Sequence, residues 1–122
     1  MFISRVLLIV LLGACATATI DPNSKPPDWP VLTRRTVIVN TEEELKRVCG
    51  DAPHPGYRVE GCAVINFKLK TCTINLAKRR GEAPWTIKEE NDHCDGKDHP
   101  GGTALRRAWE WWKLLEKLKL AK

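Results

Sequence analysis

Residues 36–49 read TVIVNTEEELKRVC and lead from a strand directly into a helix. The β-branched run over residues 36–40 favours a strand, because branched side chains pack well on a pleated surface. Thr41 can cap the following helix with Glu44 at its third position, and three acids lie beside the positive end of the helix dipole. The sequence therefore predicts a strand followed at once by a short helix that ends at about Cys49.

Further secondary structure is expected downstream of this unit. Residues 58–67 and 71–76 alternate well enough to form a hairpin of two strands. A polar helix is expected over about residues 85–94, and a last helix over residues 103–122. The order strand, helix, hairpin, helix, helix predicts an α+β domain, in which a small three-stranded sheet carries helices on one face and ends in a C-terminal amphipathic helix.

The length and composition of the chain limit the possible classes of protein. The 122 residues leave room for one domain of ordinary size. A content of 43% hydrophobic and 29% charged residues argues against a disordered, collagen-like or polytopic membrane protein. The formal net charge is +5, and residues 103–122 alone contain six Lys and Arg against two Glu. The basic character therefore belongs to the C-terminal segment and does not describe the rest of the domain.

The N-terminus has the pattern of an export signal. Arg5 precedes an apolar run over residues 6–12, which is too short to span a bilayer. The sequence LGAC at residues 12–15 resembles a bacterial lipobox, whose Cys is lipidated after cleavage on its amino side. We therefore expect a lipoprotein signal peptide over residues 1–14 and a lipidated Cys15. The alternative is an ordinary signal peptide in which the Cys is incidental.

A tether and a location follow from this interpretation. Residues 15–35 are rich in proline and are expected to form a tether between the lipid and a domain over residues 36–102. Ala16 is not the Asp that retains many such lipoproteins at the inner membrane. We therefore expect an exported protein, held by its N-terminal lipid to the periplasmic face of the outer membrane.

The four remaining cysteines are expected to form disulfides, because export leads to an oxidising compartment. Four cysteines allow three pairings, and sequence alone does not choose between them. A short hairpin between Cys62 and Cys72 favours that pair, which leaves Cys49 to pair with Cys94. A four-cysteine zinc site is disfavoured, because no two of these cysteines form a C-x2-C pair.

The most specific stretch is EENDHCDGKDH at residues 89–99. Its pattern, E-E-x-x-H-x-x-G-x-x-H, resembles the H-E-x-x-H motif and its G-x-x-H extension in the metzincin-like zincins, a group of zinc metallopeptidases. In that motif two ligands at i and i+4 share one helix face, and the glycine lets the chain turn so that the last His returns to the metal. The resemblance implies a minimal zincin-like domain over residues 36–102. The alternative is a polar helix end with histidines placed by chance.

The resemblance also implies a role for each matching residue. Glu90 would be the general base that takes a proton from a zinc-bound water, and His93 and His99 would bind the zinc. Gly96 would form the turn. Glu89 stands where the family has its first His, so it is either a carboxylate ligand in place of the imidazole or the sign of a degenerate site.

Two functions remain as expectations. The first is an exported lipoprotein with a divergent zinc metallopeptidase-like site, which would hydrolyse peptide or protein substrates if active. The alternative is a non-catalytic envelope lipoprotein that uses the same scaffold to bind a surface partner, in a phage- or plasmid-encoded role. Since zincin substrates pair with an edge strand, residues 71–76 are the candidate substrate strand, with a core strand as the equal alternative.

The C-terminal helix concentrates tryptophan among basic residues, with Trp109, Trp111 and Trp112 near its middle. Apolar residues recur at helical spacing and form one face. This face either closes the core with its tryptophans or lies on anionic lipid as a second membrane contact. Nucleic-acid binding would suit the charge but not the compartment, so no nucleic-acid partner is expected.

Overall fold

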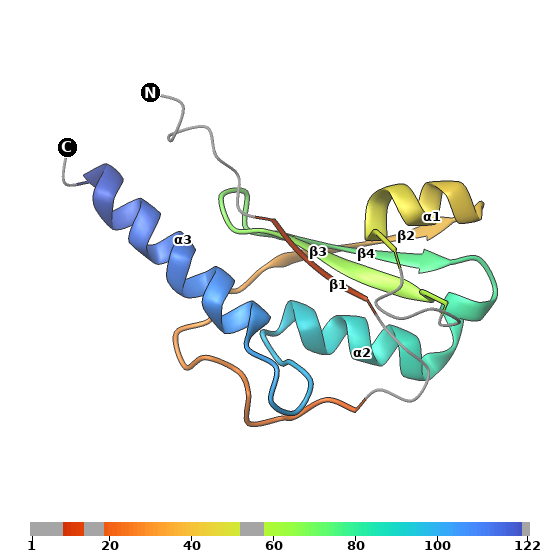
Figure 1. Cartoon of the computed structure of the whole chain (residues 1–122), viewed down its shortest axis with the longest axis horizontal. Helices are drawn as coiled ribbons and strands as arrows, with labels where there is room; N and C mark the ends of the chain where they lie inside the picture. Colours follow the sequence, from red (N-terminus) through yellow and green to blue (C-terminus); the bar gives the residue numbers. More distant parts are fainter. Residues whose placement is uncertain (1–8, 14–18, 52–57, 121–122) are drawn as a thin grey trace.

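The chain has an α+β fold, which confirms the predicted fold class (Figure 1). The computed structural model describes residues 9–13, 19–51 and 58–120. In chain order the elements are β1 (Ile9–Gly13), β2 (Thr33–Val39), α1 (Glu42–Cys49), β3 (Gly61–Asn66), β4 (Thr71–Ala77), the 3-10 turn η2 (Arg80–Glu82), α2 (Pro84–Cys94) and α3 (Ala104–Leu120).

The sheet is mixed and has the strand order β1-β3-β4-β2. β3 and β4 form the predicted antiparallel hairpin, and β2 lies parallel to β4. These are the three predicted strands. A fourth strand, β1, pairs antiparallel with β3, although residues 9–13 were expected to belong to a signal peptide. Pairing with β3 gives hydrogen-bond partners to backbone N–H and C=O groups of this apolar segment. Hydropathy alone does not reveal such backbone pairing.

Helices cover both faces of the sheet, so the expectation of helices on one face is wrong. In Figure 1, α1 lies above the sheet and α2 lies below it. Leu45 of α1 packs in one apolar cluster with Cys62 of β3, whereas Ile65 of β3 belongs to a second cluster on the α2 and α3 side. Successive residues of a strand point to opposite faces, so a strand with apolar residues at adjacent positions supplies two cores.

The predicted start of α1 is confirmed. Thr41 precedes the helix in an extended conformation, and its side-chain Oγ1 accepts a hydrogen bond from the Glu44 backbone N–H at 3.2 Å. This bond satisfies one of the donors that the first turn of a helix leaves without an intrahelical partner. Gly50 ends the helix with a φ of 79°.

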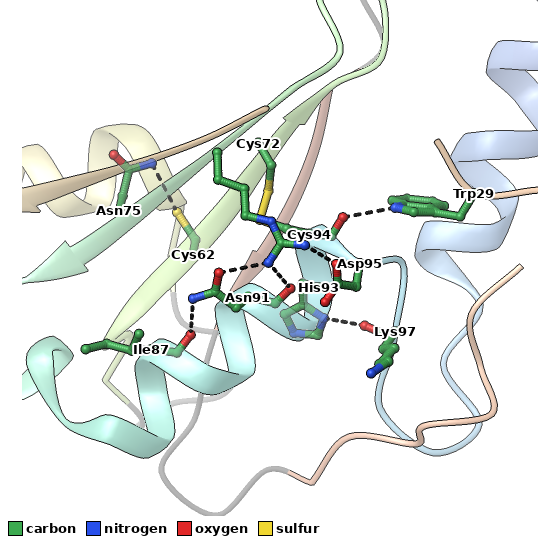
Figure 2. Close-up of a disulfide and its surroundings, with 11 residues drawn as sticks. Trp29, Cys62, Cys72, Asn75, Ile87, Asn91, His93, Cys94, Asp95 and Lys97 are labelled. Atoms are coloured by element: carbon green, nitrogen blue, oxygen red, sulfur yellow. Dashed lines mark hydrogen bonds and ion pairs between the residues drawn. A yellow bond between two sulfur atoms is a disulfide. The ribbon is translucent and has the colours of Figure 1, made fainter. Parts of the chain in front are cut away.

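The disulfides join Cys49 to Cys62 and Cys72 to Cys94, so the predicted pairs Cys62–Cys72 and Cys49–Cys94 are wrong. In the β3–β4 hairpin Cys62 lies opposite Asn75, three positions from Cys72. An odd offset along a strand places two side chains on opposite faces, so the sheet separates Cys62 from Cys72. Each observed disulfide instead joins the last residue of a helix to the sheet face that the helix covers, and Figure 2 shows the Cys72–Cys94 bond.

The described part of the predicted tether, residues 19–35, lies against the domain and is not a free linker. Trp29 is 8% exposed and Leu32 is 7% exposed. The Trp29 indole Nε1–H donates to the Cys94 carbonyl oxygen at 2.9 Å (Figure 2). An aromatic side chain in a proline-rich segment therefore anchors that segment on the end of α2.

α3 runs obliquely past one end of the sheet, and its C-terminal half extends away from it (Figure 1). Leu105 is fully buried at the start of the helix, and Trp109 and Trp112 are partly buried against the same cluster. Among the described residues, no helix combines the length and the apolarity that crossing a membrane requires.

Candidate metal centre

The face that α2 turns to the interior is polar. The buried residues of the helix recur at spacings of three and four and are Thr86, Glu89, Glu90, His93 and Cys94. The helix begins at Pro84, whose fixed φ suits the first helical position and whose missing N–H is not needed there. Polar and ionisable side chains are seldom buried without a specific partner, so this face is the first place to look for a functional site.

Gly96 makes the turn that the sequence predicts. Its φ is 87°, and its backbone N–H donates to the His93 carbonyl oxygen at 2.9 Å. A Cβ at this position would lie 2.5 Å from Cδ2 of Trp29. Both the backbone conformation and the nearby indole ring therefore require glycine, and the turn carries the chain back towards the helix.

The turn brings together the three predicted metal ligands. Glu89, His93 and His99 each offer one ligand atom, and these atoms all lie within 4.8 Å of one another. The two imidazole rings are 4.9 Å apart between centroids, with an interplanar angle of 74°. Atoms this close can share one ion after small side-chain movements, because zinc–ligand bonds of about 2 Å bring ligand atoms to within about 3 to 4 Å of each other.

Both histidines are fixed in the same tautomer by backbone carbonyl groups. The Nδ1–H of His93 donates to the Lys97 carbonyl oxygen at 2.8 Å, and the Nδ1–H of His99 donates to the Thr19 carbonyl oxygen at 2.7 Å (Figure 2 shows the first). A carbonyl oxygen only accepts, so each Nδ1 carries a hydrogen, and in the neutral form of either ring the lone pair is on Nε2. Metal-binding histidines in proteins are commonly oriented in this way by an acceptor behind the ring.

The His93 Nε2 atom is buried and has no hydrogen-bond partner among the described residues. Burial lowers the pKa of His93, despite an opposing contribution from the bond to the Lys97 carbonyl, so the ring is neutral at neutral pH. A neutral imidazole is the form that binds a metal. The buried, unsatisfied lone pair therefore fits a cation at this position.

Glu90 is fully buried, and neither of its carboxyl oxygens has a hydrogen-bond partner among the described residues. Burial and, to a lesser extent, the neighbouring charge of Glu89 raise the pKa of Glu90 to about 9. Without a metal, this carboxyl group is therefore protonated at neutral pH. A cation bound near Glu89 would favour the ionised form of both carboxyl groups and so oppose this rise in the pKa of Glu90.

Asp98 is a positioning residue that the sequence analysis missed. It is 5% exposed, and its Oδ1 accepts the His99 backbone N–H at 2.8 Å. The same residue is held by the N-terminal segment, because the Asp21 N–H donates to the Asp98 carbonyl at 2.8 Å and the Asp98 N–H donates to Ser24 Oγ at 2.6 Å. Its place shortly before a helix start was the available signal, since acidic residues favour such positions.

Other predicted site residues lie elsewhere. Residues 71–76 fall in β4, which lies between β3 and β2, so the core-strand alternative is confirmed and the edge-strand alternative is wrong. β4 is a central strand, and its successive side chains point alternately to the two covered faces of the sheet. Trp111 is 50% exposed, unlike the partly buried Trp109 and Trp112. Cys15 lies outside the described residues.

No protein-family model matches the chain, and no curated protein or solved structure proved similar to it. The likeness to zincins therefore depends on residues 89–99 alone. The geometry of Glu89, His93 and His99 supports a metal site independently of that likeness.

Proposed function

We propose that this chain binds zinc through Glu89, His93 and His99 and that the site is a divergent metallopeptidase-like centre. The observation that carries the proposal is the pair of imidazoles, each with Nδ1–H tied to a backbone carbonyl and each close to the Glu89 carboxylate. This arrangement places one potential ligand atom of each residue within 4.8 Å of the others, with no other described role for the His93 Nε2 atom.

The donor set suits zinc. Two imidazoles and one carboxylate form one of the ligand sets that catalytic zinc ions use, with the fourth position left for water. When bound, zinc would supply a Lewis acid and an acidified water. Within the chain, Glu90 would accept the proton and Asp98 would hold the His99 backbone in place. The carboxylate charge of Glu89 would make the centre a weaker acid than a three-histidine site.

Export and anchoring belong to the same proposal. The two disulfides are compatible with an oxidising compartment, and the lipobox-like sequence supports lipidation of Cys15. Release of residues 1–14 would also remove β1, so the mature domain would keep the three strands β3, β4 and β2. The mature protein would then be held to the membrane by its lipidated N-terminus, four residues before the Thr19 carbonyl that orients His99.

Peptide cleavage tests the catalytic half of this proposal. The wild-type protein loaded with zinc is incubated with a generic peptide library, beside Glu90→Gln and the control Asp92→Asn on the same helix. We expect cleavage by the wild type and by Asp92→Asn, and a loss of about 100-fold or more in Glu90→Gln with zinc binding retained. Equal activity of Glu90→Gln and the wild type would assign Glu90 no catalytic role.

A non-catalytic scaffold is the second candidate, and the burial of the site favours it. Glu90 and His93 have no exposed surface, and Glu89 is only 6% exposed. A surface partner could then bind the domain while the metal has a structural role. Cleavage by Glu89→His but not by the wild type would support this candidate. Absence of zinc from both proteins would reject both roles of the metal.

A further inference from the structure

α3 carries two apolar stripes on opposite sides. The inner stripe packs on the core through Leu105, Ala108, Trp109 and Trp112. The outer stripe, which we define as Trp111, Leu114 and Leu118, is exposed at 50%, 44% and 53%, respectively. Positions at i, i+3 and i+7 share one helix face, and this face points away from the inner stripe. The inner stripe packs against the core, whereas the outer stripe is exposed.

The rotation of α3 is fixed by its inner contacts. The Trp109 ring lies 5.1 Å from Phe67 and 6.1 Å from Trp29 between centroids. Lys113 forms an ion pair with Asp28 on the same side. Turning the outer stripe inwards would break this aromatic cluster and expose Leu105. The exposure of the outer stripe is therefore a property of the folded domain.

Unpaired basic side chains lie on the face and at one edge of the outer stripe. Arg107 lies one turn before Trp111 on the same helix face, and Lys117 lies one turn after Leu114 at the edge of the stripe. Glu110 lies one turn before Leu114 at the same edge, and it forms an ion pair with Lys113. Arg107 and Lys117 are exposed, and neither forms an ion pair within the part of the chain that the structure describes. The stripe is therefore flanked by two unpaired basic side chains and by one acid that Lys113 already neutralises.

We propose that the outer stripe of α3 rests on an anionic membrane surface. Tryptophan favours the headgroup region, leucine enters the acyl boundary, and Lys or Arg attracts anionic headgroups. Pairing of two copies through the same stripe would instead bring like charges together. The proposal does not depend on the zinc site, because no residue of α3 is among the metal ligands.

The test uses the full chain with Cys15→Ser, which carries no lipid at that position. It is mixed with vesicles of phosphatidylglycerol or phosphatidylcholine that contain brominated lipid, and tryptophan quenching is measured. We expect quenching with phosphatidylglycerol that falls clearly in Trp111→Phe and is unchanged in Trp85→Phe, which alters a tryptophan on α2 that is 63% exposed, against 50% for Trp111. The readout reports on Trp111 itself, whatever other segment of the chain contacts lipid.

A charge variant tests the electrostatic part. Lys117→Gln should weaken binding to phosphatidylglycerol by about fivefold at low salt. Equal quenching of the parent and Trp111→Phe, or equal binding to both lipids, would overturn the proposal. A dimer in sedimentation that dissociates in Trp111→Phe would also overturn it and would assign the stripe to a second copy.

Discussion

Two helices of this domain are built alike at their ends and differ in what they bury. α1 and α2 each end at a cysteine that is bridged to the sheet, and each is followed within two residues by a glycine with positive φ. α1 turns Leu45 and Cys49 to the interior. α2 turns a threonine, two glutamates, a histidine and a cysteine to the interior.

This difference separates a helix that stabilises the fold from a helix that carries a site. Apolar burial of α1 contributes to stability directly. The buried carboxyl group of Glu90 and the unsatisfied Nε2 of His93 cost free energy in the metal-free chain. Polar groups that oppose the stability of their own fold indicate a functional site, and here they support the proposed binding of a cation.

The largest expected effect comes from removing each helix-end disulfide. Loops closed over sequence separations of 22 and 13 predict a loss of about 3 kcal/mol in the free energy of unfolding for each pair. Urea unfolding of Cys72→Ser/Cys94→Ser and Cys49→Ser/Cys62→Ser measures this loss. The two variants should also differ in zinc affinity, because only Cys94 lies next to a proposed ligand, His93. Zinc titration measures this difference.

We expect the variant that lacks the Cys72–Cys94 disulfide to lose about tenfold or more in zinc affinity, as outer-shell changes do. The variant that lacks Cys49–Cys62 should keep its zinc affinity under conditions where it is folded. Equal losses in both variants would contradict the assignment of α2 as the site helix.

The two glycines that end α1 and α2, Gly50 and Gly96, should differ in how much stability is lost when each is replaced by alanine. Gly96→Ala adds a Cβ that would meet Trp29 at 2.5 Å, whereas Gly50→Ala has nothing within 4 Å. Both substitutions strain a residue with positive φ, so Gly50→Ala should cost about 1 to 2 kcal/mol of unfolding free energy and Gly96→Ala about 2 to 3 kcal/mol. Thermal unfolding of both variants measures the difference. A larger loss in Gly50→Ala would contradict the contact between Gly96 and Trp29.

An expected effect of the opposite sign is a pH-dependent gain in stability in Glu90→Gln. In the metal-free protein the pKa of Glu90 is raised from 4.5 to about 9, so its contribution to stability is present below pH 4.5 and is lost as the pH rises towards 9. Glu90→Gln has no proton to lose and should be more stable than the wild type at neutral pH by about 2 kcal/mol. Urea unfolding of both chelator-treated proteins, measured across this pH range, tests the prediction.

Glu44→Gln on the exposed first turn of α1 is the matched control and should show no such gain. A difference between Glu90→Gln and the wild type that does not change with pH would indicate that Glu90 is not a buried, protonated carboxyl group.

Local patterns predicted most of the secondary structure. The capped start of α1, the β3–β4 hairpin and the turn at Gly96 each follow from residues close in sequence. The cluster of Glu89, His93 and His99 was also predictable, because helical spacing and one tight turn determine it. Local rules succeed where a feature is formed by neighbours in the chain.

Features that depend on distant segments could not be predicted in this way. The disulfide pairs depend on which face of the sheet each cysteine occupies, and that depends on the register of β3 against β4. The anchoring of Trp29 on the end of α2 depends on a contact across 65 residues. The carbonyl of Thr19 behind His99 lies 80 residues away in sequence and has no side-chain signature.

Metal content tests the central claim most directly. The oxidised protein is purified, equilibrated with zinc, freed of unbound metal and analysed for zinc and sulfur, beside His93→Ala and the same-helix control Asp92→Asn. The account predicts about one zinc per chain in the wild type and in Asp92→Asn, and almost none in His93→Ala. A folded wild type without zinc, or His93→Ala with as much zinc as the wild type, would contradict it.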